Sequence, residues 1–352
     1  MSPRRRSRSR AGGDDVALLL GVETSCDETA AAVVRDGRRV LSNVVLSQDV
    51  HEIYGGVVPE LASREHIRTI APVIRRALAE ASVEGRDLDA LAATTGPGLI
   101  GSLVVGLSVA RAFAWSLGIP LVPVHHLEAH LYAIRLGFPE TPFRFVALIV
   151  SGGHTELVHV RGEGDYALLG RTRDDAAGEA FDKAAKMTGL PYPGGPAVDR
   201  IARSGDRKAH AFPRARLEPE TLDFSYSGVK TAVRYALQGD PSLAGTGKLS
   251  DLLASFQEAI VGPLVENARR ALDRVGERRI AVCGGVAANA RLREAFGEMA
   301  SASGAELLLA PLEYCTDNAA MVASAGDAAF RLGKCAPLEQ SASADPPLPF
   351  KD

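Results

Sequence analysis

Two segments of this chain, far apart in the sequence, repeat one pattern: an apolar run, a short polar turn and a second apolar run. The first is Val22–Thr29 and the second is Val150–Glu156. Short apolar runs separated by turn residues are typical of consecutive strands. Further along the chain, strand-like runs alternate with longer helical patterns, as in α/β proteins. The repeat therefore predicts an α/β fold with two domains of similar plan, and 352 residues suit two cores better than one.

The boundary between the predicted domains falls near Leu136–Pro142. We expect a first domain over residues 16–138 and a second over 139–334, with the last helix, about 316–333, able to pack back on the first domain. Residues 1–15 are rich in arginine and read as a disordered basic tail, either solvated or in contact with RNA. Residues 335–352 are expected to form a flexible tail.

A pair of histidines, His126 and His130, lies four residues apart. On a helix of ~3.6 residues per turn they share one face, where two imidazoles can hold one transition metal. A third ligand could come from Asp317, in the polar run that opens the last helical stretch. Two histidines and one carboxylate leave open positions on iron, and zinc also accepts this set. The alternative is two ordinary helix histidines, one packed and one solvated.

A zinc peptidase is the obvious first hypothesis for such a pair, and the sequence argues against it. A zincin carries its catalytic glutamate directly after the first histidine, as H-E-x-x-H. Here Glu128 is two residues after His126. It is ~200° around the helix from that histidine and points away from the metal face.

Glycine-rich turns follow two of the predicted strands. In Ser151–Thr155, glycines permit positive φ angles and let backbone N–H groups converge on an anion, although such a turn can need glycine for geometry alone. Gly284-Gly285-Val286 leads into a helix, where Asn289 can donate hydrogen bonds to a flat ligand. A third turn, Pro193–Pro196, is flanked by Asp182 and Asp199, which suit ribose hydroxyls or cap helices. Together these turns predict a nucleotide cleft between actin-like lobes.

The composition is that of an ordinary soluble protein, with 46% apolar and 24% charged residues. The formal charge of −3 does not favour a strongly basic nucleic-acid binder. The cysteines have no CxxC spacing and indicate reduced thiols. We find no export signal and no apolar run near the ~20 residues of a membrane span. We therefore expect a cytoplasmic protein without a membrane partner.

The motifs, taken in order, resemble the TsaD/Kae/Gcp family over roughly residues 16–334. This family comprises the tRNA N6-adenosine threonylcarbamoyltransferases, here of the bacterial or organellar type. The resemblance is carried by Gly21–Thr29, His125–His130, Ser151–Thr155, Gly178–Lys183, Tyr192–Pro196, Phe224–Lys230, Gly284–Asn289 and Cys315–Asn318.

The resemblance implies an actin/Hsp70-like (ASKHA) fold and transfer of threonylcarbamoyl from threonylcarbamoyl-AMP to N6 of adenosine 37, in tRNAs that read codons beginning with A. It implies one divalent metal per subunit, iron or alternatively zinc, held by His126, His130 and Asp317. It also implies partners: tRNA, a TsaB-like paralogous subunit and a TsaE-like ATPase. The residues implied to line the substrate pocket are Ile149, Val150, Ser151, Gly152, Gly153, Asp182, Gly195, Asp199 and Asn289.

Two roles remain open at this point. Asp27 and Glu28 could orient the attacking amine or accept its proton, or they could only stabilise their turn. The cation-rich segment Arg200–Arg216 could contact a phosphate backbone or form a solvated face. The rival functions are an actin-like ATPase or kinase, a catalytically silent scaffold subunit of the same complex and, more distantly, a metallopeptidase.

Overall fold

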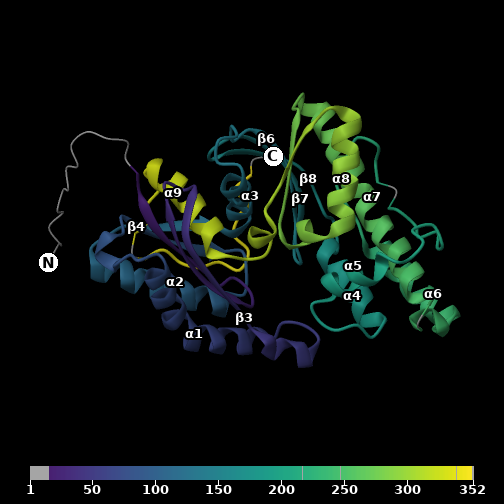
Figure 1. The fold of residues 1–352 in the computed structure, drawn as a ribbon, viewed down its shortest axis with the longest axis horizontal. Coiled ribbons are helices and arrows are strands. Elements are labelled where there is room, and N and C mark those ends of the chain that lie inside the picture. Colours follow the sequence, from purple (N-terminus) through teal and green to yellow (C-terminus); the bar gives the residue numbers. More distant parts are fainter. Residues whose placement is uncertain (1–15, 216, 246, 338, 351–352) are drawn as a thin grey trace. The chain divides into compact units, whose positions relative to one another are not determined.

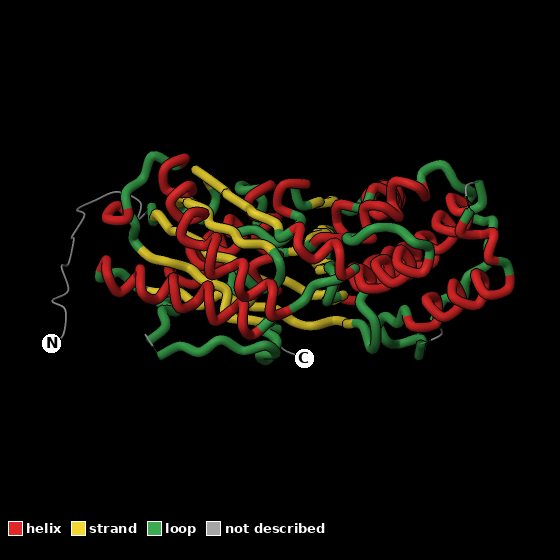
Figure 2. Tube along the Cα trace, turned by 90° about the horizontal axis from the view of Figure 1, so that it is seen from below, coloured by secondary structure: helices red, strands yellow, loops and turns green. Residues whose placement is uncertain are grey.

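The computed structural model describes residues 16–215, 217–245, 247–337 and 339–350 (Figures 1 and 2). The arginine-rich tail predicted for residues 1–15 lies outside the described residues. The chain divides into two compact units. Unit 1 combines the chain up to Asp49 with Val57–Glu140 and Asp317–Pro349, and unit 2 combines Val50–Gly56 with Thr141–Thr316 and the chain from Phe350.

Each unit is built on a five-stranded sheet, and the two sheets have the same plan. The strands are β1 (Leu18–Glu23), β2 (Glu28–Arg35), β3 (Arg39–Ser47), β4 (Ala90–Gly96) and β5 (Leu121–His125) in unit 1, and β6 (Phe145–Val150), β7 (Thr155–Gly162), β8 (Asp165–Arg171), β9 (Arg279–Cys283) and β10 (Glu306–Leu309) in unit 2. The strand orders are β3-β2-β1-β4-β5 and β8-β7-β6-β9-β10. In both sheets the first three strands are antiparallel and the last two join in parallel. This confirms the predicted α/β fold with two similar domains.

Helices cover both faces of the unit 1 sheet (Figure 1). They are α1 (Pro59–Glu80), α2 (Ile100–Leu117), α3 (His126–Gly137) and α9 (Ala319–Arg331). Helices α1 and α2 bury Ile70, Ile74 and Leu107 against Leu20 and Val22 of β1. On the other face α9 packs on β1, β2 and β4, and α3 packs on α9.

Strand β1 is buried on both faces, and the alternation of its side chains decides what each face meets. Leu20 and Val22 enter the core beneath α1 and α2. Gly21 faces α9, because a Cβ there would lie 2.3 Å from the Ala319 carbonyl oxygen. Glu23, two residues on, shares the face of Gly21. The last residue of β1 therefore presents a carboxylate towards the side of the sheet that holds α3 and α9.

The contact between α9 and the sheet is unusually close because both surfaces carry small residues. A Cβ on Gly21 would also lie 2.8 Å from the backbone nitrogen of Ala323, and a Cβ on Gly326 would lie 2.4 Å from the Ala92 side chain. Helix α9 therefore completes the core of unit 1 by packing on strands β1 and β4, which lie much earlier in the sequence.

Unit 2 carries the remaining helices. They are α4 (Ala177–Met187), α5 (Gly194–Ala202), α6 (Ser227–Gly239), α7 (Leu249–Val275) and α8 (Ala290–Ser303). Helix α7 packs on β6, β7 and β9 and also contacts α5, α6 and α8. The rings of Phe181 in α4 and Phe256 in α7 meet edge to face, with centroids 5.6 Å apart.

Short 3-10 helices occur in both units. They are η1 (Asp49–Tyr54), η2 (Gly85–Asp87), η3 (Pro241–Ala244), η4 (Gly285–Ala288) and η5 (Leu312–Tyr314).

The segment after α9 makes backbone hydrogen bonds within unit 1. The Ala336 amide donates to Leu121, and the Ser343 amide donates to Thr95. The Gly98 amide in turn donates to Ala344. This part of the predicted C-terminal tail therefore runs beside β4 and β5.

Helix α2 corrects one expectation from the sequence. Within the described chain it is long and apolar enough, by length and composition, to cross a membrane. A third of it is buried, and Leu107, Ala110 and Ala114 belong to the core of unit 1. Its apolar composition thus has a packing role inside the unit.

Candidate functional site

The predicted histidine pair lies at the start of α3. Strand β5 ends at His125, and α3 begins with His126, so His130 follows one turn later on the same face. Both histidines are buried: the exposed fraction is 6% for His126 and 0% for His130. Their centroids are 4.8 Å apart.

Asp317, which directly precedes the N-cap residue of α9, lies beside this pair although it is distant in the sequence. Asn318 begins α9 by accepting a hydrogen bond from the Met321 amide at 3.0 Å, which fixes the residues just before the helix. Asp317 Oδ1 lies 3.4 Å from His126 Nε2 and 3.3 Å from His130 Nε2. One ligand atom from each of the three residues lies within 4.8 Å of the others. Two imidazole nitrogens from buried histidines and one carboxylate oxygen from the half-buried Asp317 fit one transition metal ion.

Glu23 belongs to this site although the sequence analysis did not single it out. Glu23 is fully buried, and its Oε2 lies 3.1 Å from His126 Nδ1. Thr94 donates a hydrogen bond to the same oxygen at 2.7 Å, and the Ser25 amide donates to Oε1. A proton held on Nδ1 by a carboxylate leaves the Nε2 lone pair free for a metal. A charged residue at the end of an apolar strand was the signal that could have revealed it.

The charges of this cluster stabilise one another. Burial alone would raise the pKa of Asp317, but His126 and His130 outweigh it and lower that pKa far below its usual range. Burial would likewise raise the pKa of Glu23, and His126 lowers it. Burial opposes the charged form of His126, yet Asp317 and Glu23 raise its pKa. The cluster thus favours positive charge on His126, which lies between the carboxylates of Glu23 and Asp317.

The turn between β1 and β2 places Asp27 and Glu28 in unit 1, near this cluster. Burial, followed by the charges of Asp317 and Asp27, raises the pKa of Glu28 to about 9. The buried His66 of α1 lies 2.9 Å from the Cys26 carbonyl oxygen and 2.8 Å from the Thr29 hydroxyl. Because these contacts flank Asp27 and Glu28, α1 fixes the position of the acidic turn.

The turn between β6 and β7 is a donor-rich counterpart in unit 2. Its ends are closed by the Ser151 amide, which donates to the His154 carbonyl oxygen at 2.8 Å. Gly152 and Gly153 are exposed, and their amides donate to no other residue in the described part of the chain. The turn lies against the start of α4, because a Cβ on Gly178 would be 2.5 Å from the Ser151 carbonyl oxygen. Free amides beside a helix N-terminus are suited to an anion.

The glycine turn after β9 approaches the same strand end. Gly284 has a φ of +94°, and a Cβ there would lie 2.4 Å from the Val150 carbonyl oxygen. Ile149 pairs with Cys283 across β6 and β9. The structure therefore brings the turn that begins at Gly284 beside the segment Ile149–Gly153 in unit 2.

The other predicted pocket residues hold helix ends in unit 2. Asp182 Oδ1 accepts from the Gly194 amide at 2.8 Å and the Gly195 amide at 3.3 Å, at the start of α5. Asp199 Oδ1 accepts from the Ala290 amide at 3.2 Å, while its Oδ2 accepts from Arg203. Asn289 caps α8 through the Leu292 amide. These contacts join α4, α5 and α8 into one frame.

The cation-rich segment 200–216 is partly neutralised by neighbouring acids. Arg203 pairs with Asp199 at 2.8 Å, and Arg207 pairs with Glu294 at 2.7 Å. Paired cations contribute less to an interaction with phosphate than free cations do. This segment is therefore a weaker phosphate-binding surface than its composition suggests.

Known proteins similar to this chain define its family. The family model of TsaD, tRNA N6-adenosine threonylcarbamoyltransferase, matches residues 39–324. A protein of that name from Syntrophus aciditrophicus (strain SB) is 52% identical over 332 residues, covering 94% of this chain and 98% of the relative. Its namesake from Magnetococcus marinus is 55% identical over 319 residues, covering 88% and 90%.

Solved structures at lower identity show the same fold. Full-length HypF, in a phosphate- and nucleotide-bound form, aligns with a TM-score of 0.56 at 14% identity, over 93% of this chain and 47% of HypF. Component A of the Acidaminococcus fermentans (R)-2-hydroxyglutaryl-CoA dehydratase aligns with a TM-score of 0.52 at 16% identity, over 89% and 97%. These neighbours have the actin-like (ASKHA) fold. The cluster of His126, His130 and Asp317, the two sheets of like plan and the close relatives together lead to one conclusion: this chain belongs to the TsaD family of tRNA N6-adenosine threonylcarbamoyltransferases.

Proposed function

We propose that this protein transfers the threonylcarbamoyl group of threonylcarbamoyl-AMP to N6 of adenosine 37, in tRNAs that read codons beginning with A, forming t6A. Family membership over nearly the whole chain supports the reaction. The observation that carries the proposal is the buried cluster of His126, His130 and Asp317, since these are the three residues expected to hold the metal of an active family member.

The reaction forms one bond and breaks one bond. The N6 nitrogen of the adenosine bonds to the carbamoyl carbon, and the bond from that carbon to the phosphate oxygen of AMP breaks. AMP leaves with the bonding electron pair, and N6 releases one proton. Because an aromatic amine is a weak nucleophile, positioning and a more electrophilic carbamoyl carbon are the main needs.

Unit 2 is proposed to bind the adenylate part of the substrate. The free amides of Gly152 and Gly153 can donate to the phosphate and stabilise the charge that AMP carries away. The start of α4 adds the positive end of a helix beside them. Asp182, Gly195, Asp199 and Asn289 are proposed to line the nucleoside portion, supported by their connected helix ends.

Unit 1 is proposed to act on the threonylcarbamoyl end. His126, His130 and Asp317 fit iron, with zinc as the alternative. Lewis acidity at the carbamoyl oxygen is the chemistry that a metal held by these residues supplies when bound. Asp27 and Glu28 are proposed to orient the amine or accept its proton, supported by the contacts of His66 that fix their turn.

The alternatives make different demands on these residues. An actin-like ATPase or kinase needs the phosphate-binding turn but not the His126–His130 pair. A catalytically silent scaffold subunit needs neither. Three ligand atoms gathered in one buried cluster favour the transferase over both alternatives.

A TsaB-like subunit is proposed to dock on α1 and α2. These neighbouring helices expose three apolar side chains. The exposed fractions are 65% for Ile67, 50% for Ile100 and 49% for Val104. Exposed apolar side chains gathered on adjacent helices are typical of a protein interface. A TsaE-like ATPase and a cytoplasmic location complete the proposal, on the strength of the family.

The test is transfer of labelled threonylcarbamoyl from the adenylate to tRNA, by the protein with its partner subunits. Wild type is expected to label tRNA, and the His126→Ala variant is expected to lose nearly all of that activity. His210→Ala, a change of the same kind outside the site, serves as the control and should keep it. No labelling by wild type would overturn the function, and full labelling by His126→Ala would overturn the role of the metal cluster.

A further inference from the structure

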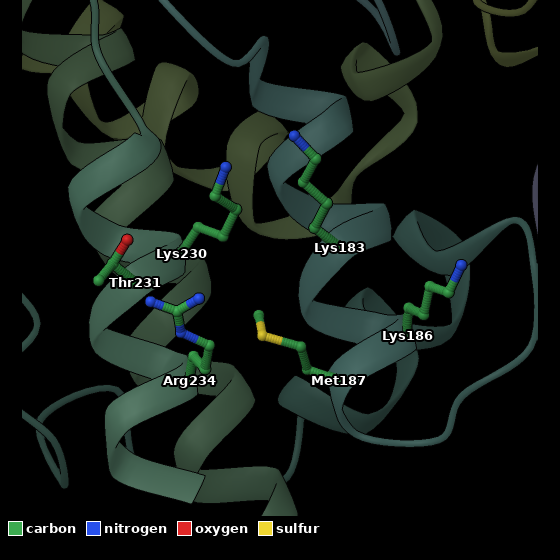
Figure 3. Close-up of a pocket in the computed structure, with 6 residues that line it drawn as sticks. All are labelled: Lys183, Lys186, Met187, Lys230, Thr231 and Arg234. Carbon is green, nitrogen blue, oxygen red and sulfur yellow. The ribbon is translucent and has the colours of Figure 1, made fainter. Parts of the chain in front are cut away.

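A second cluster of cations lies in unit 2, between α4 and α6. It surrounds a pocket of about 210 Å³ lined by Lys183, Lys186 and Met187 of α4 and by Lys230, Thr231 and Arg234 of α6 (Figure 3). Figure 3 shows Met187 and Arg234 extending into the space between the helices, with Lys183 and Lys230 reaching to one side of it. Lys186 lies at the edge, and its amine points away from Arg234.

Asp175 holds one side of this pocket in place. Its carboxylate accepts from Lys183 at 2.7 Å and from Lys230 at 2.5 Å, so it links α4 to α6. The neighbouring Asp174 accepts from the Tyr226 and Ser227 amides at 2.7 and 3.3 Å and thereby fixes the start of α6. The two walls of the pocket are therefore set by hydrogen bonds to one short segment.

The charges of the pocket do not cancel. Four cations line it, and Asp175 and Glu179 pair with Lys183 and Lys230. Within the described chain, neither Lys186 nor Arg234 forms an ion pair with a carboxylate. Both of these residues are exposed. An uncompensated pair of cations at a concave surface favours a ligand with negative charge.

The size of the pocket indicates what kind of anion fits. A site for a complete small molecule usually encloses ~300–1,000 Å³, so this pocket suits one part of a larger ligand. The guanidinium of Arg234 can donate to a phosphate, and the apolar chain of Met187 can contact the adjoining sugar or base.

We propose that the pocket between α4 and α6 binds a backbone phosphate of the tRNA. This inference rests on the proposed function, because it takes tRNA as the substrate. It assigns the contact to Arg234, with Lys186 adding positive charge at the edge of the pocket, whereas two cations of the segment 200–216 are paired with acids. The contact positions the tRNA and reads no base.

The experiment compares two double variants of the full-length protein that change its net charge equally. Lys186→Ala with Arg234→Ala removes the unpaired cations, and Arg203→Ala with Arg207→Ala removes two paired ones. We expect the first to raise the Kd for tRNA roughly tenfold and to reduce the slope of log Kd against log salt by about 2. The second is expected to do much less. Equal effects from both variants would show that only total charge matters and would overturn the proposal.

Two further measurements make the result specific. Thr231→Trp fills the pocket and keeps every charge, and it should weaken tRNA binding; unchanged affinity would overturn the proposal. In turnover assays, the Lys186→Ala and Arg234→Ala double variant should raise KM for tRNA and leave KM for threonylcarbamoyl-AMP unchanged. A rise only in the second KM would also overturn it. Absence of t6A formation by wild type would instead count against the proposed function, since tRNA binding is measured without turnover.

Discussion

The polar turns after β1 and β6 occupy equivalent places in two sheets of the same strand order. The polar groups that they present differ: one turn offers carboxylates and the other offers backbone N–H donors. The first turn is acidic: Asp27 and Glu28 follow the buried carboxylate of Glu23. The second turn is formed by Ser151–His154 and offers free backbone amides and no carboxylate. The strands that flank the turns are alike, so the difference lies in a few residues at the strand ends.

The comparison extends to the carboxyl group that each hairpin buries. Glu23 meets His126, which lowers the pKa of Glu23 against the effect of burial. Glu156, at the start of β7, is also buried, and burial raises its pKa to about 7 although Arg171 opposes the shift. One hairpin thus keeps its buried acid charged beside the cluster of His126, His130 and Asp317, and the other favours the neutral form beside a turn with free backbone amides. A duplicated fold can in this way serve two halves of one reaction.

The strongest test of this division removes Asp317, the carboxylate proposed to hold the metal in unit 1. Asp317→Ala should abolish stoichiometric metal binding and reduce transfer by about 10³-fold, or roughly 4 kcal/mol. Binding of the adenylate should change by less than about threefold, as for substitutions outside a site. Metal analysis and calorimetric titration with a nonreactive adenylate analogue measure the two effects. Loss of both metal and adenylate binding would show that the turns do not divide the work.

The second test concerns the neutral acid of the other hairpin. The folded-state pKa of Glu156 is raised, so its stabilising contribution is complete below about pH 4.5 and is lost as the pH rises through about 7. Glu156→Gln should therefore stabilise the protein at pH 8, by up to about 3 kcal/mol, and change little at pH 4.5. Urea unfolding at both pH values measures this. Glu220→Gln, at an exposed position, should show no such difference, and an equal response of the two variants would contradict the prediction.

The third test displaces the second turn without changing any charge. Gly178→Ala places a Cβ 2.5 Å from the Ser151 carbonyl oxygen, so the turn must move. Adenylate binding should weaken by about 2 kcal/mol, or roughly thirtyfold in Kd, while metal content stays unchanged. Gly228→Ala is the matched control, because Gly228 is likewise the second residue of its helix and a Cβ there meets no atom within 4 Å. Equal affinities of the two variants would argue against a phosphate site at this turn.

The smallest effect is expected from the residue that orients a metal ligand. Glu23→Gln keeps a hydrogen-bond acceptor near His126 Nδ1 but loses the charge. Metal affinity should fall about tenfold. Competition with a chelator of known affinity measures the change, and Glu80→Gln on the surface of α1 is the control. An unchanged metal affinity would restrict Glu23 to a structural role.

Much of the fold follows from local patterns in the sequence. Apolar runs that end in polar or glycine-rich turns predict strands β1, β6 and β9, and their alternation with helical patterns predicts the two-domain plan. The spacing of His126 and His130 places both on one helix face, and Asp317 lies beside them as the motif order implied. These predictions succeed because period and spacing are local properties.

The remaining features depend on contacts between distant segments. Glu23 reaches His126 only because alternation along β1 gives it the face towards α3 and α9. His66 joins α1 to the acidic turn, and Asp175 joins α4 to α6. In each case one residue of the pair looks ordinary in its own segment. The sequence alone therefore does not show which polar residue meets which partner.

The close packing of α9 on β1 also determines the order in which the protein can mature. Gly21 and Gly326 let the backbone of α9 approach β1 and β4, and Asp317 lies at the start of this last helix. During synthesis, which proceeds from the N-terminus, the two histidines leave the ribosome long before Asp317. The segment Thr141–Thr316, which makes up most of unit 2, is made in between, so it can fold while unit 1 still lacks one layer. The cluster of His126, His130 and Asp317 therefore forms only after Thr141–Thr316 has been made, and a product that stops before Asp317 cannot assemble it.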